Sequence, residues 1–142
     1  MAFSQQKFRE IVFQLLYSRD FAVDPGEGGL FLLMEQLAVT KKIVRLAMEK
    51  QEQIWEKKET LDTLIASVAQ DYSFERIPRI ERNILRLGVF ELFHSGDVPP
   101  KVAISEAIRL SRKFATHEAA NFVNALLDAL YAPSPAEQCS AK

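Results

Sequence analysis

Apolar residues recur along most of the chain at intervals of three and four positions, the spacing that places them on one face of a helix. The first stripe contains five residues near the amino terminus: Phe8, Ile11, Val12, Leu15 and Leu16. No stretch alternates apolar and polar residues as a half-buried β-strand does. The pattern therefore predicts an all-α protein.

Turn-forming residues divide this pattern into about seven helices. Proline and glycine interrupt the chain at residues 24–29, and a short apolar helix is expected at residues 30–38. Thr40 is a suitable N-cap for a longer helix that reaches Trp55, because its hydroxyl can accept a hydrogen bond from the first turn. Another apolar stripe covers residues 61–68.

Three more helices are predicted toward the carboxyl terminus, over residues 78–91, 99–114 and 116–130. Pro78 and Pro100 suit the first turn of a helix, where no backbone N–H is needed, and Thr116 suits the N-cap position. A lobe boundary is expected near residues 72–77. The predicted domains are an amino-terminal lobe (1–72), a carboxy-terminal lobe (73–132) and a flexible tail (133–142).

The net charge of the chain is close to zero, which limits how it can bind nucleic acid. Its 18 Lys and Arg residues face 19 Asp and Glu residues, for a formal charge of -1. RNA would have to bind a local patch, such as residues 77–114, with seven basic and four acidic side chains, or the basic cluster of residues 41–58. Solvated helix faces are the alternative explanation of both patches.

Cysteine usage and hydropathy point to the cytoplasm. Cys139 is the only cysteine, which fits a reducing compartment and excludes an internal disulfide. Charged residues interrupt the first apolar positions, so no signal peptide is predicted. No uncharged stretch is long enough to cross a bilayer, and no membrane association is expected.

The sequence offers little for catalysis. His94 and His117 are the only histidines, and neither has a second ligand at metal-binding spacing. The chain contains no phosphate-binding glycine loop and no Gly-x-Ser-x-Gly elbow. We therefore predict a binding protein that is not an enzyme, with no catalytic residue, no metal and no cofactor.

Three motifs follow one another in the carboxy-terminal half. They read IPRIERNILRLGVFEL at residues 77–92, DVPPKVAISEAIRLSRKF at residues 97–114 and NFVNALLD at residues 121–128. The opening helix adds Arg9-Glu10 and, one turn later, Leu16-Tyr17-Ser18. In this order and spacing the motifs closely resemble the NusB family of bacterial transcription antitermination factors, over nearly the whole chain.

The resemblance implies a fold of two packed three-helix lobes and a function in transcription. Proteins of this family bind the boxA sequence in the leader of nascent ribosomal RNA, together with the ribosomal protein NusE. The pair helps RNA polymerase to read through terminators. The expected partners are boxA-type single-stranded RNA, NusE and the RNA polymerase elongation complex with other Nus factors.

The resemblance also implies roles for individual residues. In the family, RNA meets the first helix and the nearby last helix, and NusE docks mainly on the carboxy-terminal lobe. The RNA-binding candidates are Lys7, Arg9, Arg86, Asn121 and Phe122, and the protein-binding candidates are Glu81 and Arg82. Cations that hold the backbone and aromatic side chains that stack on unpaired bases suit single-stranded RNA.

Structural roles compete with these assignments. Phe122 has neighbouring apolar residues and can pack in the core instead of stacking on a base. Arg86 can form a salt bridge with Glu81 or Glu91 instead of contacting RNA or a partner. For Tyr17, packing in the core or between the lobes is favoured over base stacking.

The chain departs from the family pattern in its cations. Residues 4–7 (Ser-Gln-Gln-Lys) stand where the family usually has a run of arginines, and Asn121 replaces a lysine. Each lost cation weakens the neutralisation of the RNA backbone. The resemblance therefore implies reduced RNA affinity of the isolated chain and a greater dependence on NusE.

Two other functions fit the same helical pattern. A homodimeric interaction or regulatory protein would pair through the Phe-rich amino-terminal surface and bind RNA weakly or not at all. The second function is that of an RNA-binding lobe, of the kind that precedes the catalytic domain in some ribosomal RNA cytosine methyltransferases. The second is disfavoured, because 142 residues leave no room for a methyl-donor domain.

Overall fold

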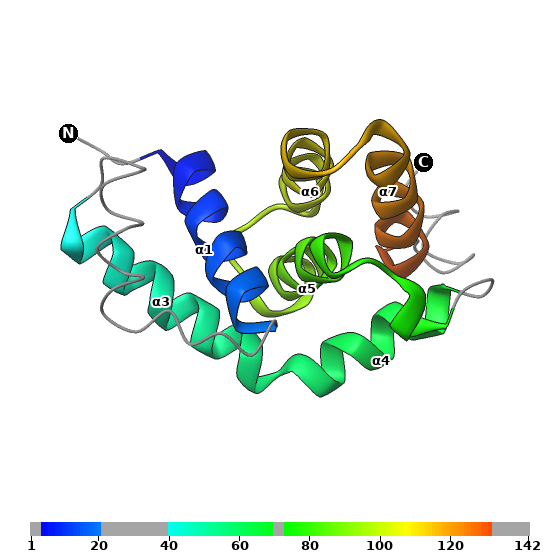
Figure 1. Cartoon of the computed structure of the whole chain (residues 1–142), viewed down its shortest axis with the longest axis horizontal. Coiled ribbons are helices and arrows are strands. Elements are labelled where there is room, and N and C mark those ends of the chain that lie inside the picture. Colours follow the sequence, from blue (N-terminus) through cyan, green and yellow to red (C-terminus); the bar gives the residue numbers. More distant parts are fainter. Residues whose placement is uncertain (1–3, 21–39, 70–72, 132–142) are drawn as a thin grey trace.

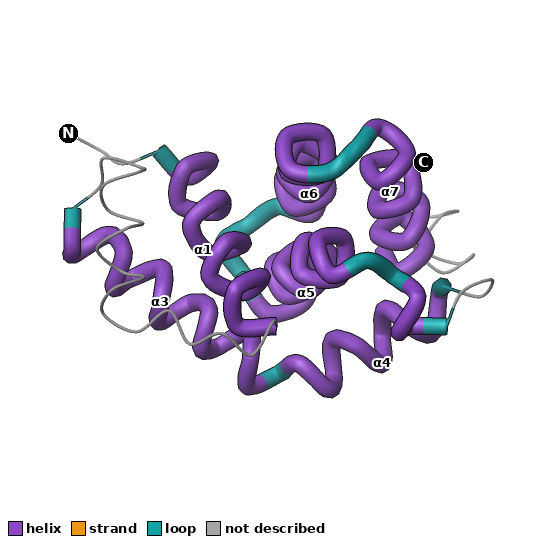
Figure 2. The backbone as a smooth tube through the Cα atoms, viewed as in Figure 1, coloured by secondary structure: helices purple, strands orange, loops and turns teal. Residues whose placement is uncertain are grey.

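The computed structural model describes residues 4–20, 40–69 and 73–131. Within them the chain forms helices and no strands, as predicted (Figure 2). The helices are α1 (Gln5–Asp20), α3 (Lys41–Glu56), α4 (Lys58–Val68), α5 (Arg79–His94), α6 (Pro100–Phe114) and α7 (His117–Tyr131), with a short 3-10 helix η1 (Phe74–Arg76) before α5. The helix predicted at residues 30–38 and the predicted tail at residues 133–142 lie outside the described residues.

Local hydrogen bonds fix the helix starts where the sequence predicts them. The Thr40 hydroxyl accepts a hydrogen bond from the Ile43 N–H at 3.3 Å, and the Thr116 hydroxyl accepts one from the Ala119 N–H at 3.0 Å. Both bonds satisfy an N–H that has no partner inside its own helix. Pro78 stands just before α5 and not in its first turn, because α5 begins at the next residue.

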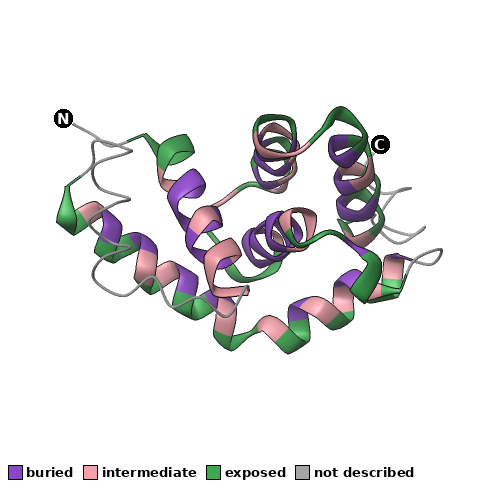
Figure 3. Cartoon of the chain, in the orientation of Figure 1, coloured by how far each residue is buried: buried purple, intermediate pink, exposed green. Residues whose placement is uncertain are grey.

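Helix α5 occupies the centre of the molecule (Figure 1). It packs against α1, α3, α4, α6 and α7. Every residue from Asn83 to Glu91 is buried, so α5 has no solvent-facing side along this stretch (Figure 3). A helix that is buried all round belongs to the interior of a bundle.

The other helices cover α5 from different sides. Helix α1 packs mainly against α3, and α6 packs mainly against α7. Helix α4 precedes the predicted lobe boundary but packs against α5 and α7, which follow it. The buried apolar residues form one cluster that runs from Ile11 in α1 through Ile65 in α4 to Leu127 in α7. The division into two lobes remains a prediction, and the packing of α4 crosses its boundary.

Gly88 allows the helices around α5 to approach closely. A Cβ atom at this position would lie 3.2 Å from the Leu127 Cδ1 atom of α7 and 3.5 Å from the Ala107 Cβ atom of α6. No helix among the described residues is long and apolar enough to cross a membrane.

Candidate functional site

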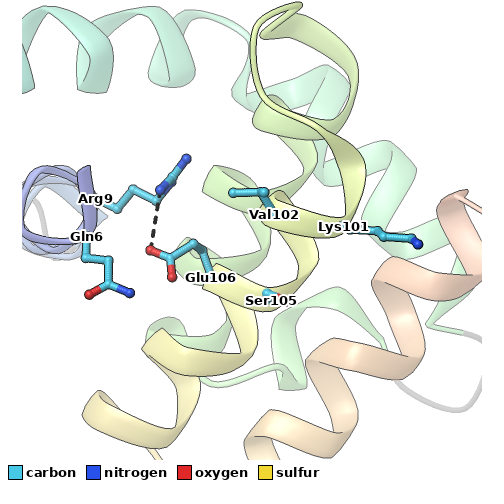
Figure 4. Close-up of a pocket in the computed structure, with 6 residues that line it drawn as sticks. All are labelled: Gln6, Arg9, Lys101, Val102, Ser105 and Glu106. Carbon is cyan, nitrogen blue, oxygen red and sulfur yellow. Dashed lines mark hydrogen bonds and ion pairs between the residues drawn. The ribbon is translucent and has the colours of Figure 1, made fainter. Parts of the chain in front are cut away.

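The side chain of Arg9 is buried inside the protein. Its Nε group donates to both carboxylate oxygens of Glu91 in α5, each at 3.0 Å. Its Nη1 group lies 3.4 Å from the Glu106 Oε1 atom of α6 (Figure 4). Only 8% of the Arg9 side chain is exposed. The geometry thus gives Arg9 two protein carboxylates as partners, in place of the phosphates that the family resemblance implies.

Further cations extend this cluster across four helices. Arg109 in α6 donates to Glu106 at 2.9 and 3.1 Å and to Glu10 of α1 at 2.7 Å. Lys113 donates to Glu10 at 2.9 Å, and Lys50 of α3 donates to the second oxygen of Glu91 at 3.1 Å. We call these seven residues the ion-pair cluster: Arg9, Glu10, Lys50, Glu91, Glu106, Arg109 and Lys113.

The cluster shifts the protonation of its own members. Burial alone would raise the pKa of Glu10, but the hydrogen bonds and charges of Arg109 and Lys113 outweigh it and hold the pKa below its ordinary value of 4.5. The hydrogen bond to Glu106 raises the pKa of Arg109. The Glu10 carboxylate and the Arg109 guanidinium therefore stay charged at neutral pH and bind one another.

Lys7 differs from Arg9 although only two residues separate them. It is exposed in the first turn of α1, and its backbone N–H points to the Ser4 hydroxyl at 3.4 Å. Within the described ranges no carboxylate pairs with its amino group. A cation at the amino end of a helix, where free N–H groups also favour anions, can contact a phosphate.

Arg86 is the most completely enclosed of the predicted RNA contacts, with 2% of its side chain exposed. Its guanidinium donates to both oxygens of Asp62 at 2.7 and 2.9 Å and to the Asn83 side chain at 3.0 Å. Asp20 lies 3.3 Å away. The salt-bridge alternative is what the structure shows, but its partners are Asp62 and Asp20. Glu81 or Glu91 as the partner was wrong, because the helix turns Arg86 toward α4 and the end of α1.

The guanidinium of Arg86 also packs on aromatic rings. It lies 5.7 Å from the ring centre of Trp55 and 5.6 Å from that of Phe74. These rings and carboxylates surround Arg86 with protein atoms, so the side chain offers almost no surface to RNA.

Glu81 and Phe122, predicted for different partners, line one groove. The groove has a volume of about 350 Å³ and is lined by Arg76, Ile77, Pro78, Glu81, Thr116, Glu118, Ala119 and Phe122. Burial raises the pKa of Glu81, and among the described residues no cation pairs with this carboxylate. An unpaired, half-buried carboxylate is suited to receive a cation from a partner.

The remaining candidates lie close to this groove. Phe122 is half-buried and packs against the core, which supports its packing role. Asn121 is exposed next to it. Arg82 donates to the Ile77 and Glu75 carbonyl oxygens at 2.7 and 2.6 Å, which attaches it to the turn around η1.

The two predicted RNA-binding helices are not each other's main packing partners. Helix α6 lies between α1 and α7 in Figure 1. Helix α6 packs against α7, and the ion-pair cluster joins α6 to α1. Lys101 is an exposed cation in the first turn of α6. It was not among the RNA-binding residues predicted from the sequence. A surface that includes Lys7 and Asn121 must therefore cross α6.

Most of the ion-pair cluster could not be predicted from the sequence. Glu10 is bonded to Arg109, 99 residues away, and to Lys113, 103 residues away. The one available signal was the position of Arg9-Glu10 beside a buried apolar stripe, where charged residues need partners. His94 and His117 lie at a helix end and a helix start, and the described residues contain no group of three or more potential metal ligands.

Comparison with known proteins gives one consistent result. Residues 6–132 match the NusB family. The transcription antitermination protein NusB of Chlamydia pneumoniae is 39% identical over 132 residues, which cover 93% of this chain and 82% of the relative. NusB of Dehalococcoides mccartyi is 36% identical over 130 residues, covering 92% of this chain and 91% of the relative.

Solved structures agree with these relatives. The NusB structure from T. maritima has a TM-score of 0.77 at 27% identity, and 99% of each chain is covered. A chain in the crystal structure of antitermination factors NusB and NusE in complex with double-stranded RNA has a TM-score of 0.75 at 29% identity, covering 89% of this chain and 95% of that one. The chain therefore belongs to the NusB family.

Proposed function

We propose that this protein is a transcription antitermination factor that binds boxA-type RNA of nascent ribosomal RNA together with the ribosomal protein NusE. The observation that carries the proposal is the similarity to a chain in the structure of NusB and NusE in complex with double-stranded RNA, which extends over 89% of this chain. NusB relatives 36–39% identical share the antitermination name. Association with the RNA polymerase elongation complex and other Nus factors is part of the same proposal.

The proposed RNA surface runs from the first turn of α1 across α6 to α7. Lys7 and Lys101 are exposed cations on the first two helices, and Asn121 and Phe122 contribute from the third. Three helices with few cations fit a single strand held by scattered phosphate contacts and one stacked base. Arg9 and Arg86 are left out of this surface because their side chains are buried against carboxylates.

The proposed NusE site is the groove that contains Glu81. The Glu81 carboxylate is half-buried, and no cation of the described ranges pairs with it. The groove lining includes the apolar residues Ile77 and Pro78. A basic side chain of NusE would neutralise Glu81 while its carbon chain covered the apolar wall. Phe122 lines the same groove, so RNA and NusE would meet near this residue.

A titration with fluorescent boxA-type RNA tests the proposal, with and without NusE. We expect binding that is tighter with NusE present and that weakens as salt rises. Lys7→Ala should lower the slope of log affinity against log salt by about one phosphate contact and leave the melting temperature unchanged, because Lys7 is exposed. Gln53→Ala, at an exposed position of α3, is the matched control. Absence of RNA binding in both conditions would contradict the function.

A further inference from the structure

We infer that Arg9 is a positioning residue for RNA binding, which acts through Glu106 and Glu91 to hold the RNA-presenting turn of α1 and makes no phosphate contact itself. The inference rests on the proposed RNA surface. It assigns to the ion-pair cluster the task of fixing the place of Lys7 relative to α6.

The Arg9 guanidinium lies between carboxylates of α5 and α6. It has a carboxylate of α5 on its Nε side and a carboxylate of α6 on its Nη1 side, and the carboxylate of Glu91 is 1% exposed. A phosphate bound at the Nε or Nη1 group would displace the carboxylate found there, and Glu91 and Glu106 would each lose one of their two cations. Direct phosphate contact is therefore disfavoured.

The ion-pair cluster anchors the start of α1 to α6. Arg109 of α6 donates to the Glu10 carboxylate at 2.7 Å and to the Gln6 backbone carbonyl at 3.2 Å. Arg9 adds its contact with Glu106. Lys7 thus lies between residues that are individually bonded to α6, so the position of its amino group depends on these bonds.

The space between the start of α1 and α6 is partly open. A depression of about 390 Å³ is lined by Gln6, Arg9, Lys101, Val102, Ser105 and Glu106 (Figure 4). The Phe13 and Phe114 rings join α1 to α6 farther along, with their centres 5.0 Å apart, and charged pairs connect the start of α1 to α6. Loss of one pair should therefore loosen the start of α1 without unfolding the α3, α5 and α7 packing.

The sign of one substitution separates positioning from electrostatics. Glu106→Gln removes a negative charge near the proposed RNA surface, and by charge alone it should strengthen RNA binding. If Glu106 serves to hold Arg9 and Arg109, the same change should weaken binding. Glu59→Gln makes the same charge change at an exposed site on α4, where no cation pairs with the carboxylate in the described part of the chain, and serves as the control.

The experiment measures RNA affinity against salt for the full chain with NusE, at a temperature where circular dichroism shows each variant folded. We expect Glu106→Gln and Arg9→Ala to weaken binding about three- to tenfold with the wild-type salt slope, Arg9→Lys to recover part of the loss, and Glu59→Gln to bind as the wild type. The inference would be overturned if Arg9→Ala lowered the salt slope by one phosphate contact. It would also be overturned if Glu106→Gln bound RNA as well as the wild type or better.

A second measurement does not need RNA. Amide hydrogen exchange of residues 8–12 should be about tenfold faster in Glu106→Gln than in the wild type, while exchange in α5 stays unchanged. Unchanged exchange at the start of α1 would overturn the inference even if the protein binds no RNA. Failure of the wild type to bind RNA, by contrast, would remove the proposed function and leave the exchange result to decide whether the cluster holds α1.

Discussion

At the scale of single residues, three cations with the same predicted role have three different surroundings. Lys7 is exposed, Arg9 is held by two carboxylates, and Arg86 is enclosed by carboxylates and aromatic rings. Charge alone therefore does not decide which of them can meet RNA. The decisive quantity is the energy needed to take the guanidinium from its partners, which is high for a buried pair.

Arg86→Leu should lower the free energy of unfolding by about 3–5 kcal/mol, because Asp62 would remain partly buried without its cation and Asp20 would keep only the more distant Arg79, at 4.0 Å. Urea denaturation followed by circular dichroism measures this loss. Lys7→Ala, the exposed counterpart, should change stability by less than about 0.5 kcal/mol. Equal, small effects of both substitutions would show that Arg86 has no structural role.

Phe122→Ala should reduce RNA affinity by about 1–3 kcal/mol through the loss of base stacking, with no change in the salt slope. It should also lower the melting temperature, because the ring packs against the core as well. Affinity at several salt concentrations and a melting curve separate the two effects. A variant that is destabilised but binds RNA normally would leave Phe122 with the packing role only.

At the scale of elements, ionised side chains join the start of α1 to α6, and the Phe13 and Phe114 rings meet farther along the same two helices. The folded-state pKa of Glu10 lies below its ordinary value, so the carboxylate stabilises the fold above about pH 4.5 and loses this effect as the pH falls through the lowered pKa. The connection of α1 to α6 is therefore expected to be acid-sensitive.

As the pH falls below about 4.5, the free energy of unfolding of the wild type should fall more steeply than that of Glu10→Gln, which lacks the titrating group. Urea denaturation at a series of pH values measures both curves. Glu59→Gln should follow the wild type. Parallel curves for the wild type and Glu10→Gln would show that Glu10 has the same pKa in the folded and unfolded states.

The crossing of α5 with α6 and α7 depends on a small residue. Gly88→Ala should have little net effect, since a gain in helix propensity of about 1 kcal/mol opposes the tight contact with Leu127. Gly88→Val adds two methyl groups at the same place and should destabilise the protein by about 1–3 kcal/mol. Thermal melting of both variants checks the difference, and a Val variant as stable as the Ala variant would show that the helices can separate freely.

At the scale of the whole molecule, the carboxy-terminal helices present the proposed NusE groove while α1 presents the proposed phosphate contact. Helix α5 joins the two regions, since it packs against α1 on one side and carries Glu81 in its first turn. RNA bound at α1 and NusE bound at the groove would therefore lie on regions that α5 connects. Binding of RNA and of NusE can be tested separately through Lys7 and Glu81, because these two residues lie on different helices.

Glu81→Lys should weaken the NusE complex at least tenfold, about 1.4 kcal/mol, because it places a cation where the partner's cation is expected. The protein should remain folded, as Glu81 has no ion-pair partner among the described residues to lose. Calorimetry with NusE measures the affinity. Glu59→Lys is the control for the change in net charge, and equal affinities of the two variants would remove Glu81 from the interface.

The sequence by itself determined the helical class, the family and most helix ends. Helical periodicity and N-caps such as Thr40 and Thr116 are interactions within one or two turns, so they can be recognised from neighbouring residues. The family motifs lie in consecutive segments and are equally local. The candidate residues on the surface, Lys7 and Asn121, could be named for the same reason.

The tertiary structure alone decided which charged residues face inward. Arg9 and Glu106 are 97 residues apart and Arg86 and Asp62 are 24 apart, and each pair meets only because two helices pack in one particular orientation. It also placed Glu81 and Phe122 in one groove and α6 between α1 and α7. Such pairings depend on the crossing of helices distant in sequence, and no pattern of neighbouring residues encodes that geometry.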